Sequence, residues 1–244
     1  MKIILEAEWE AEDIVNYCRQ NQIECCVMNQ TDIFEMQPTE FFQQPVFCNT
    51  LIMQKNLKSV HKENLIPDTY DLEFKHLFKR VINMVTFKDL AKYRYPYFIK
   101  SIGNSKLVDG TVIKNSDDLA DVWVVNQVFP KPDLLLYLTE VVKFDVEYRL
   151  LVGNSRIYGI GHQKGSKSIT ISSDHPFIKD ILTTAGMRFL CIDIGYISEC
   201  KDCKDSECKE WAIVEINPPF SLDDFDIPVQ IYVQYGLDFW INNH

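Results

Sequence analysis

Apolar residues along this chain follow two different spacings, and each spacing predicts one kind of secondary structure. Short apolar or alternating runs are typical of β-strands, because successive side chains of a strand point to opposite faces. Such runs predict strands at 1–8, 23–28, 95–100, 108–113, 134–142, 145–152, 156–162, 189–195 and 211–215. Apolar residues spaced i, i+3, i+4 and i+7 predict helices beginning near Ala11, Ser116, Pro176 and Pro228. Strands and helices therefore alternate along the chain.

The order of these elements suggests three successive units. A small α/β unit comes first, then a strand–loop–strand–helix unit, then an antiparallel sheet crossed by one helix. The second helix is expected to have Ser116 as its N-cap, because a serine hydroxyl can accept a bond from the first free backbone N–H groups. The strand at 145–152 alternates polar and apolar residues, which predicts that one of its faces is exposed. Residues 30–75 contain only short apolar pieces separated by prolines.

Composition narrows the class of protein. The chain has 244 residues, 46% of them apolar and 25% charged, as is usual for a soluble globular protein. Its formal net charge is −10, which argues against nonspecific nucleic-acid binding. No apolar run reaches membrane-spanning length and no basic leader precedes an apolar segment, so we expect a cytoplasmic protein with no membrane partner.

Three of the eight cysteines lie in a polar segment between two predicted strands: Cys200, Cys203 and Cys208. A Cys-x-x-Cys pair followed by a third cysteine can bind zinc. Structural zinc sites normally have four ligands, and the fourth is missing nearby. The alternative is an exposed hairpin tip whose thiols bind nothing.

Two neighbouring strands carry oxygen ligands of the kind that Mg²⁺ prefers. Glu215 and Asn217 are two residues apart on one strand, so their side chains share a face. Asp193 lies in the apolar run before them, and a hairpin of the two strands would bring it beside Glu215. Carboxylate and amide oxygens suit a Mg²⁺ ion that also binds phosphate. The alternative is that these acids are solvated or cap the next turn.

Cationic residues upstream could hold the phosphates of a nucleotide. Lys100 ends a strand, and Lys106 lies in the loop that follows. Arg149 shares a strand face with Glu147, and its guanidinium can bridge two phosphate oxygens. The extended segment from Leu138 through Thr139, Glu140 and Val141 to Val142 could offer its backbone to an adenine edge and its apolar side chains to the ring. The alternative for each charged residue is ordinary solvation or a surface ion pair.

Taken in order, these segments resemble the ATP-grasp superfamily over roughly residues 76–222. The matching pieces are Tyr97-Phe-Ile-Lys100, Lys106 with Asp109-Gly110, Leu138-Thr-Glu140-Val, Glu147-Tyr-Arg149 with Val152-Gly153, Asp193-Ile-Gly195 and Glu215-Ile-Asn217-Pro. The likeness is greatest to poorly characterised ATP-grasp proteins of bacteria, phages and large viruses. The chain departs from the pattern in two ways: the loop after Lys100 has few glycines, and only Arg156 or Lys164 could replace a second arginine found in many relatives.

The resemblance implies an α+β fold in which two ATP-grasp subdomains, 76–142 and 143–244, grip a nucleotide behind an N-terminal α/β domain at 1–75. It implies that Lys100 and Lys106 contact ATP phosphates and that Glu140, its neighbours and Glu147 lie at the nucleotide. Arg149, with Lys100, would act in catalysis on the transferring phosphoryl group. Mg²⁺ would be held by Asp193, Glu215 and Asn217.

The activity that the resemblance implies is ATP- and Mg²⁺-dependent ligation of a carboxylate to an amine, through an acyl phosphate. The substrate would be a small molecule or a peptide. Three alternatives stay open: a noncatalytic module that binds a nucleotide or peptide, a phosphotransferase on the same fold, and a zinc-knuckle adaptor.

Overall fold

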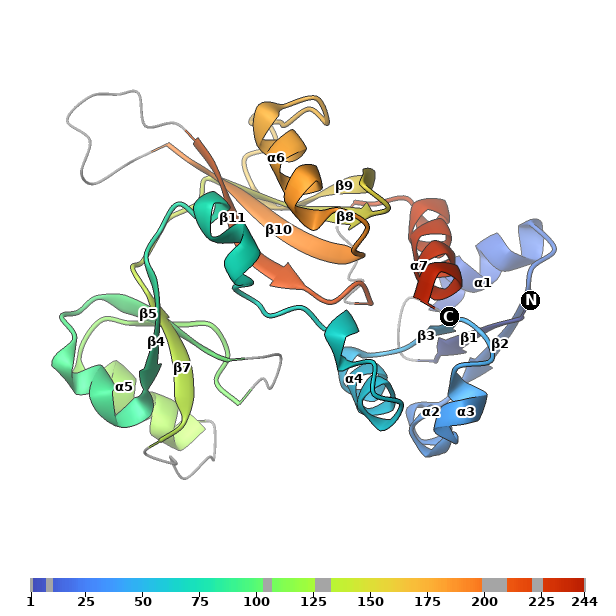
Figure 1. Cartoon of the computed structure of the whole chain (residues 1–244), viewed down its shortest axis with the longest axis horizontal. Helices are drawn as coiled ribbons and strands as arrows, with labels where there is room; N and C mark the ends of the chain where they lie inside the picture. The colour runs from blue at the N-terminus through green and yellow to red at the C-terminus, as the bar shows by residue number, and fades with distance from the viewer. Residues whose placement is uncertain are drawn as a thin grey trace.

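The computed structural model describes residues 2–7, 11–102, 107–125, 133–198, 210–220 and 226–243, and these form three β-sheets with helices packed against them (Figure 1). The sheets follow one another along the chain. Lys106, Cys200, Cys203 and Cys208 lie outside the described residues, so their predicted roles stay predictions. None of the helices in the described ranges is both long and apolar enough to cross a membrane.

The N-terminal unit is a parallel sheet in the order β2-β1-β3. Its strands are β1 (Lys2–Glu6), β2 (Glu24–Met28) and β3 (Val46–Phe47). The central strand is apolar and buried at Ile3, Ile4 and Leu5, because helices cover both faces of a parallel sheet. These helices are α1 (Ala11–Gln20), α2 (Gln30–Glu35), α3 (Pro38–Phe41), α4 (Thr50–Ser59) and, from the far end of the chain, α7 (Val229–Asn243). The C-terminal helix thus returns to the first unit (Figure 1).

A linker and an antiparallel sheet follow. The linker contains the short 3₁₀ helices η1 (Glu63–Leu65) and η2 (Leu72–Leu77). The sheet has the order β4-β7-β5-β6, and its strands are β4 (Ile82–Thr86), β5 (Tyr97–Ser101), β6 (Thr111–Ile113) and β7 (Leu135–Thr139), with η3 (Phe87–Lys92) after β4. Helix α5 (Ser116–Val125) packs Val122 into the core on one face. The N-cap prediction was wrong by one residue: Asn115 accepts from the N–H groups of Asp117 and Asp118, at 2.8 and 3.0 Å.

The third sheet is antiparallel, in the order β11-β10-β8-β9. Its strands are β8 (Val146–Gly153), β9 (Arg156–Gly165), β10 (Leu190–Ile197) and β11 (Glu210–Asn217). Helix α6 (Pro176–Ala185) buries Ile178 and Ile181 against one face. The prediction that β8 has an exposed face was wrong, because all eight of its residues are buried. Its polar residues Glu147 and Arg149 lie on the second face and are covered by charged partners.

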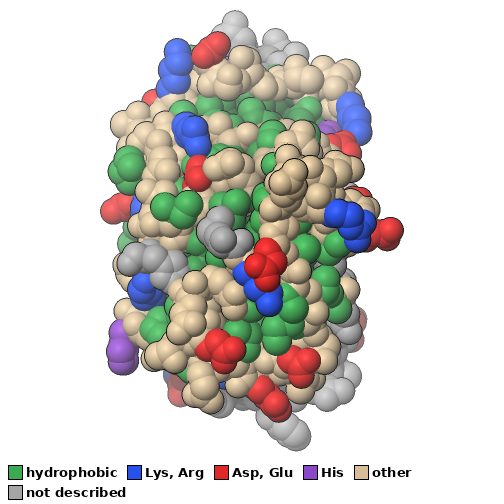
Figure 2. All heavy atoms as spheres, turned by 90° about the vertical axis from the view of Figure 1, so that its right-hand side faces the viewer, with side chains coloured by type: hydrophobic (Ala, Val, Ile, Leu, Met, Phe, Trp, Pro, Cys, Tyr) green, Lys and Arg blue, Asp and Glu red, His purple; other side chains and the backbone are tan. Residues whose placement is uncertain are grey.

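The end of the molecule that carries the N-terminal unit has no gathered basic patch among the side chains drawn in Figure 2. Lys and Arg side chains are scattered there, and several lie beside acidic ones. This distribution accords with the acidic net charge of the chain.

Candidate functional site

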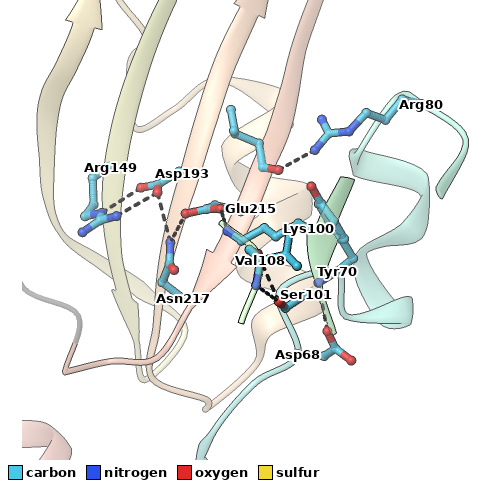
Figure 3. Close-up of polar contacts among 11 residues, drawn as sticks. Asp68, Tyr70, Arg80, Lys100, Ser101, Val108, Arg149, Asp193, Glu215 and Asn217 are labelled. Carbon is cyan, nitrogen blue, oxygen red and sulfur yellow. Dashed lines mark hydrogen bonds and ion pairs between the residues drawn. The ribbon is translucent and has the colours of Figure 1, made fainter. Parts of the chain in front are cut away.

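The middle and third sheets meet at an ion pair. Lys100, on β5, donates from Nζ to the carboxylate of Glu215, on β11 (Figure 3). The two residues are 115 positions apart in the chain and belong to different sheets. The crevice between the sheets therefore brings together a cation and an acid that the sequence analysis assigned to phosphate and metal.

The three predicted metal ligands lie next to one another on β10 and β11. The strand register places Asp193 opposite Glu215. The side-chain amide of Asn217 donates from Nδ2 to Asp193 Oδ2 and to Glu215 Oε1, both at 3.0 Å (Figure 3). Two carboxylate groups from neighbouring strands thus face one amide, as the alternation of strand side chains predicts.

Arg149 approaches the same acids from β8, on the other side of β10. Its Nε donates to Asp193 Oδ1 at 2.7 Å and its Nη2 donates to Asp193 Oδ2 at 2.8 Å. The two side chains are only 4% and 2% exposed. A charge buried this deeply needs a partner with good geometry, and the forked guanidinium provides it. Arg149 therefore fixes Asp193 in place.

The two carboxyl groups have different proton affinities. Burial raises the pKa of Asp193 to about 6, the nearby negative charges of Glu215 and Glu147 add to the rise, and Arg149 opposes it. Burial also raises the pKa of Glu215, but the charge of Lys100 and hydrogen bonds from Lys100 and Asn217 outweigh it and hold this pKa below its usual value. At neutral pH both acids are therefore anionic, and Asp193 is the one nearer to its titration point.

The arrangement fits a hard cation. Among the described residues no three His, Cys, Asp or Glu side chains lie close enough together to hold a metal ion. The candidate set here consists of two carboxylates and one amide. Mg²⁺ accepts such a set, since it binds one or two carboxylates and completes its shell with water and phosphate oxygens. Asn217 now turns its amide nitrogen toward both acids, and it would have to turn its oxygen there to ligate the ion.

A cavity of about 340 Å³ adjoins this network and extends toward the segment between the two sheets. Among the residues predicted for nucleotide binding, its lining includes Thr139, Glu140, Val141, Val142 and Glu147. Leu138 lies elsewhere: its side chain is in the apolar core on the other face of the middle sheet. Leu138 therefore does not line this cavity, because strand alternation turns it away from Thr139.

Glu147 is buried and paired. Lys164 Nζ, from β9, lies 2.9 Å from Glu147 Oε1, and the lysine itself is 65% exposed. Lys164 thus lies at the cavity, and the sequence analysis named it as one possible replacement for a second arginine. On the other side of the crevice, the Ser101 hydroxyl accepts from Val108 N at 2.6 Å and donates to Val108 O at 3.0 Å. These two bonds connect the residues on either side of the segment that contains Lys106.

Several lining residues of the cavity were absent from the sequence prediction: Tyr70, Arg80, Phe98, Val112, Phe144, Gln163 and Val214. Phe98 could have been found, because it lies two residues before Lys100 on the same strand and therefore shares its face. Tyr70 and Arg80 had no such signal, since they come from the linker, where no periodic pattern exists.

A larger cavity, of about 990 Å³, lies on the other side of Tyr70 and Arg80, which line both. Of the predicted site residues that the structure describes, none lines this larger cavity. Size alone does not mark the reacting centre. The smaller cavity borders the ion-pair network, so the candidate chemistry belongs there.

Comparison with known proteins gives the family and the fold. Residues 77–234 match the family described as "ATP-grasp domain, R2K clade family 2". A RimK domain protein ATP-grasp from Sphaerobacter thermophilus DSM 20745 superposes with a TM-score of 0.63 at 11% identity, over 98% of this chain and 99% of that one. No curated protein sequence matches.

Two further solved structures are similar in the same way. The ATP complex of D-alanine–D-alanine ligase from Bacillus anthracis has a TM-score of 0.57 and 10% identity, and both chains are covered completely. Biotin carboxylase from Campylobacter jejuni has a TM-score of 0.59 and 11% identity, over 96% of this chain and 70% of that one. The fold is therefore the α+β ATP-grasp fold, as the sequence resemblance implied. Identities this low show the fold alone.

Proposed function

The chain belongs to the ATP-grasp family, in its R2K clade, and on this premise we propose that it is an ATP- and Mg²⁺-dependent ligase that joins a carboxylate to an amine. One observation carries the proposal: a continuous network of Lys100, Glu215, Asn217, Asp193 and Arg149 crosses the crevice beside a cavity. Phosphoryl transfer needs cations and metal-binding oxygens at such close quarters.

ATP would bind as a substrate between the two sheets. Its base would lie in the cavity beside the segment 139–142, whose backbone can pair with the adenine edge. Lys100, and Lys106 from the adjoining loop, would contact the phosphates. When nucleotide binds, the phosphates would take the Lys100 ammonium away from Glu215 and leave that carboxylate available.

Asp193, Glu215 and Asn217 would hold Mg²⁺. The ion would neutralise charge on the phosphate oxygens when bound. Arg149 would keep Asp193 anionic and oriented, and its charge would stabilise the transferring phosphoryl group from behind. Here catalysis comes from positioning and charge, and the protein supplies no covalent nucleophile.

The reaction has two balanced steps. A carboxylate oxygen of the substrate attacks the γ-phosphorus, and ADP leaves with the electrons of the broken bond. The amine nitrogen then attacks the acyl carbon, phosphate leaves, and the amine loses a proton. We further propose that the carboxylate belongs to a small molecule or peptide, that the protein acts in the cytoplasm, and that the unit boundaries lie near residues 75 and 142.

Incubation of the purified protein with Mg-ATP and pools of carboxylic acids and amines tests the proposal. We expect ADP release that requires both substrates, with an amide product in the mass spectrum. ATP binding without ADP release would favour a binding module, and a stable phosphorylated product without an amide would favour a phosphotransferase. Glu215→Ala should lose the Mg²⁺ dependence of ATP binding, and equal Mg²⁺-dependent binding by both proteins would remove the metal assignment.

A further inference from the structure

Strand β11 contains one extra residue immediately before Glu215. Asp193 lies opposite Glu215, but the next residue of β10, Ile194, lies opposite Ile213. Val214 therefore has no partner on β10. This is a β-bulge, in which two residues of one strand oppose a single residue of its neighbour.

The bulge decides which face Glu215 occupies. In a regular strand Glu215 would share the face of Ile213, two residues earlier. Ile213 is fully buried in the apolar core on the α6 face of the sheet, and so is Ile216. Because of the extra residue, Val214 and Glu215 both line the cavity instead. Without the bulge, the carboxylate would point into the hydrophobic core.

The side chain of Arg80 holds the backbone at this bulge. Its Nη1 donates to Ile213 O at 2.9 Å, and its Nη2 donates to Val214 O. β11 is the edge strand of its sheet, so within the described part of the chain these carbonyls face no further strand. A forked guanidinium can bind both carbonyls at once, which a lysine ammonium, as a point charge, does less well.

Arg80 is itself fixed by its surroundings and by its place in the chain. Its guanidinium lies 5.4 Å from the ring centre of Tyr70, 5.7 Å from that of Phe78 and 5.8 Å from that of Phe144. The next residue, Val81, donates its N–H to Glu140 Oε1 at 3.2 Å and leads into β4. One short stretch therefore connects the bulge of the third sheet with the beginning of the middle sheet.

We propose that Arg80 is a positioning residue for the metal site: by binding the two bulge carbonyls, it holds Glu215 on the cavity face, opposite Asp193. In this role Arg80 does not ligate the metal and acts through the backbone of β11. The inference rests on the proposed function, because it takes Glu215 as a Mg²⁺ ligand. The inference gives a role to Arg80, a linker residue that the sequence analysis did not name.

The test measures ATP binding by calorimetry, first without metal and then at increasing Mg²⁺ concentrations. Arg80→Lys keeps the charge and Arg80→Gln keeps a neutral donor, so each can still satisfy one carbonyl. The matched control is Arg188→Lys, because Arg188 also ties the linker to the third sheet, through Asp71 and Glu73 at 2.8 Å each, but does not touch the bulge.

We expect both Arg80 variants to need about tenfold more Mg²⁺ for half-maximal ATP binding, the lower end of the loss seen when support for a metal ligand is removed. Metal-free ATP affinity should fall by a smaller factor, because the main loss acts through the metal ligand Glu215. Arg188→Lys should match wild type, because Arg188 does not touch the bulge.

Unchanged Mg²⁺ dependence in the Arg80 variants would overturn the inference. So would an equal loss of ATP affinity with and without metal, or failure of both variants to fold, because Arg80 would then support the crevice in general. A wild-type protein with no Mg²⁺-dependent ATP binding would instead refute the proposed function itself.

Discussion

Lys100 and Glu215 form an ion pair that spans the crevice, with one partner on each sheet. On the other side of the same network Arg149 is paired with Asp193. Both acids that are proposed to bind Mg²⁺ are therefore already neutralised by cations of the protein. A metal must compete with Lys100 for Glu215 unless nucleotide phosphates take the ammonium away first.

Lys100→Met should consequently raise the affinity for Mg²⁺ in the absence of nucleotide and lower the affinity for ATP. A unit charge about 4 Å away contributes about 4 kcal/mol at an effective dielectric constant of about 20, and solvent screening reduces this, so we expect about a tenfold gain in metal affinity or more. Calorimetric titration with Mg²⁺ and with ATP, each alone, measures both changes.

The control for this variant is Lys88→Met, which removes an exposed ion pair between Lys88, in η3, and Asp133, just before β7. Both affinities should stay at the wild-type values there. If Lys100→Met left the Mg²⁺ affinity unchanged, the Lys100 ammonium would not be competing with the metal for Glu215.

The sequence was sufficient to predict which residues near the end of β11 share a face, because that depends on local alternation. Glu215 and Asn217 share a face, and the register that places Asp193 beside them follows from joining two neighbouring strands. The motif order also led to the correct family and fold. These predictions required only patterns within single strands and their order along the chain.

Features that depend on contacts between distant segments were not predicted. The bulge at Val214 has no signature in an apolar strand, and Arg80 reaches it from 133 residues away in sequence. The alternation in β8 suggested an exposed face, yet Arg149 is covered because Asp193 pairs with it there. The helices in residues 30–75 were missed because α2 and α3 are too short to show a period and α4 buries the polar residues Gln54 and Asn56.

Asp193 should titrate near pH 6. Burial raises its pKa above the usual value of 3.8, so the folded protein binds this proton more tightly than the unfolded chain does. The stability that this group contributes is therefore complete below about pH 3.8 and is lost as the pH rises through about 6. The anionic form that a metal and Arg149 require develops over the same range.

Carbon-13 NMR of protein labelled at the aspartate carboxyl carbons measures this pKa directly. Asp193→Asn identifies the resonance, and the lowered pKa of Glu215 keeps that group from titrating in the same range. Mg²⁺ affinity should rise through the same pH. A resonance that titrates at or below the usual value would show that Arg149 outweighs burial.

Two glycines with positive φ, Gly165 at the end of β9 and Gly186 at the end of α6, can be compared in a stability measurement. Gly165 has φ +88°, and a Cβ there would lie 2.1 Å from the carbonyl oxygen of Asp145. Gly186 has φ +58°, and a Cβ there would meet nothing within 4 Å. Gly186→Ala should cost only the backbone strain, about 1–3 kcal/mol, whereas Gly165→Ala should cost about 2 kcal/mol more because backbone must move.

Urea unfolding of both glycine variants tests this difference. Gly165 lies opposite Val146 and directly follows Lys164, the partner of Glu147, so Gly165→Ala should also weaken ATP binding. Equal losses of stability in the two variants would mean that the backbone around Gly165 accommodates the added Cβ at no cost in free energy.

The buried pair of Arg149 and Asp193 should show strong coupling in a double-mutant cycle. Arg149→Met leaves the Asp193 carboxyl without its bidentate partner, and breaking such a pair costs about 3–5 kcal/mol. Asp193→Asn removes the charge that needs compensation, so the double variant should be more stable than the sum of the single losses predicts, by about 1–3 kcal/mol. Urea unfolding at pH 7.5, where Asp193 is anionic, measures all four proteins. Additive losses would mean that Arg149 stabilises the fold without acting through Asp193, and its assignment as the group that orients this acid would then have to be abandoned.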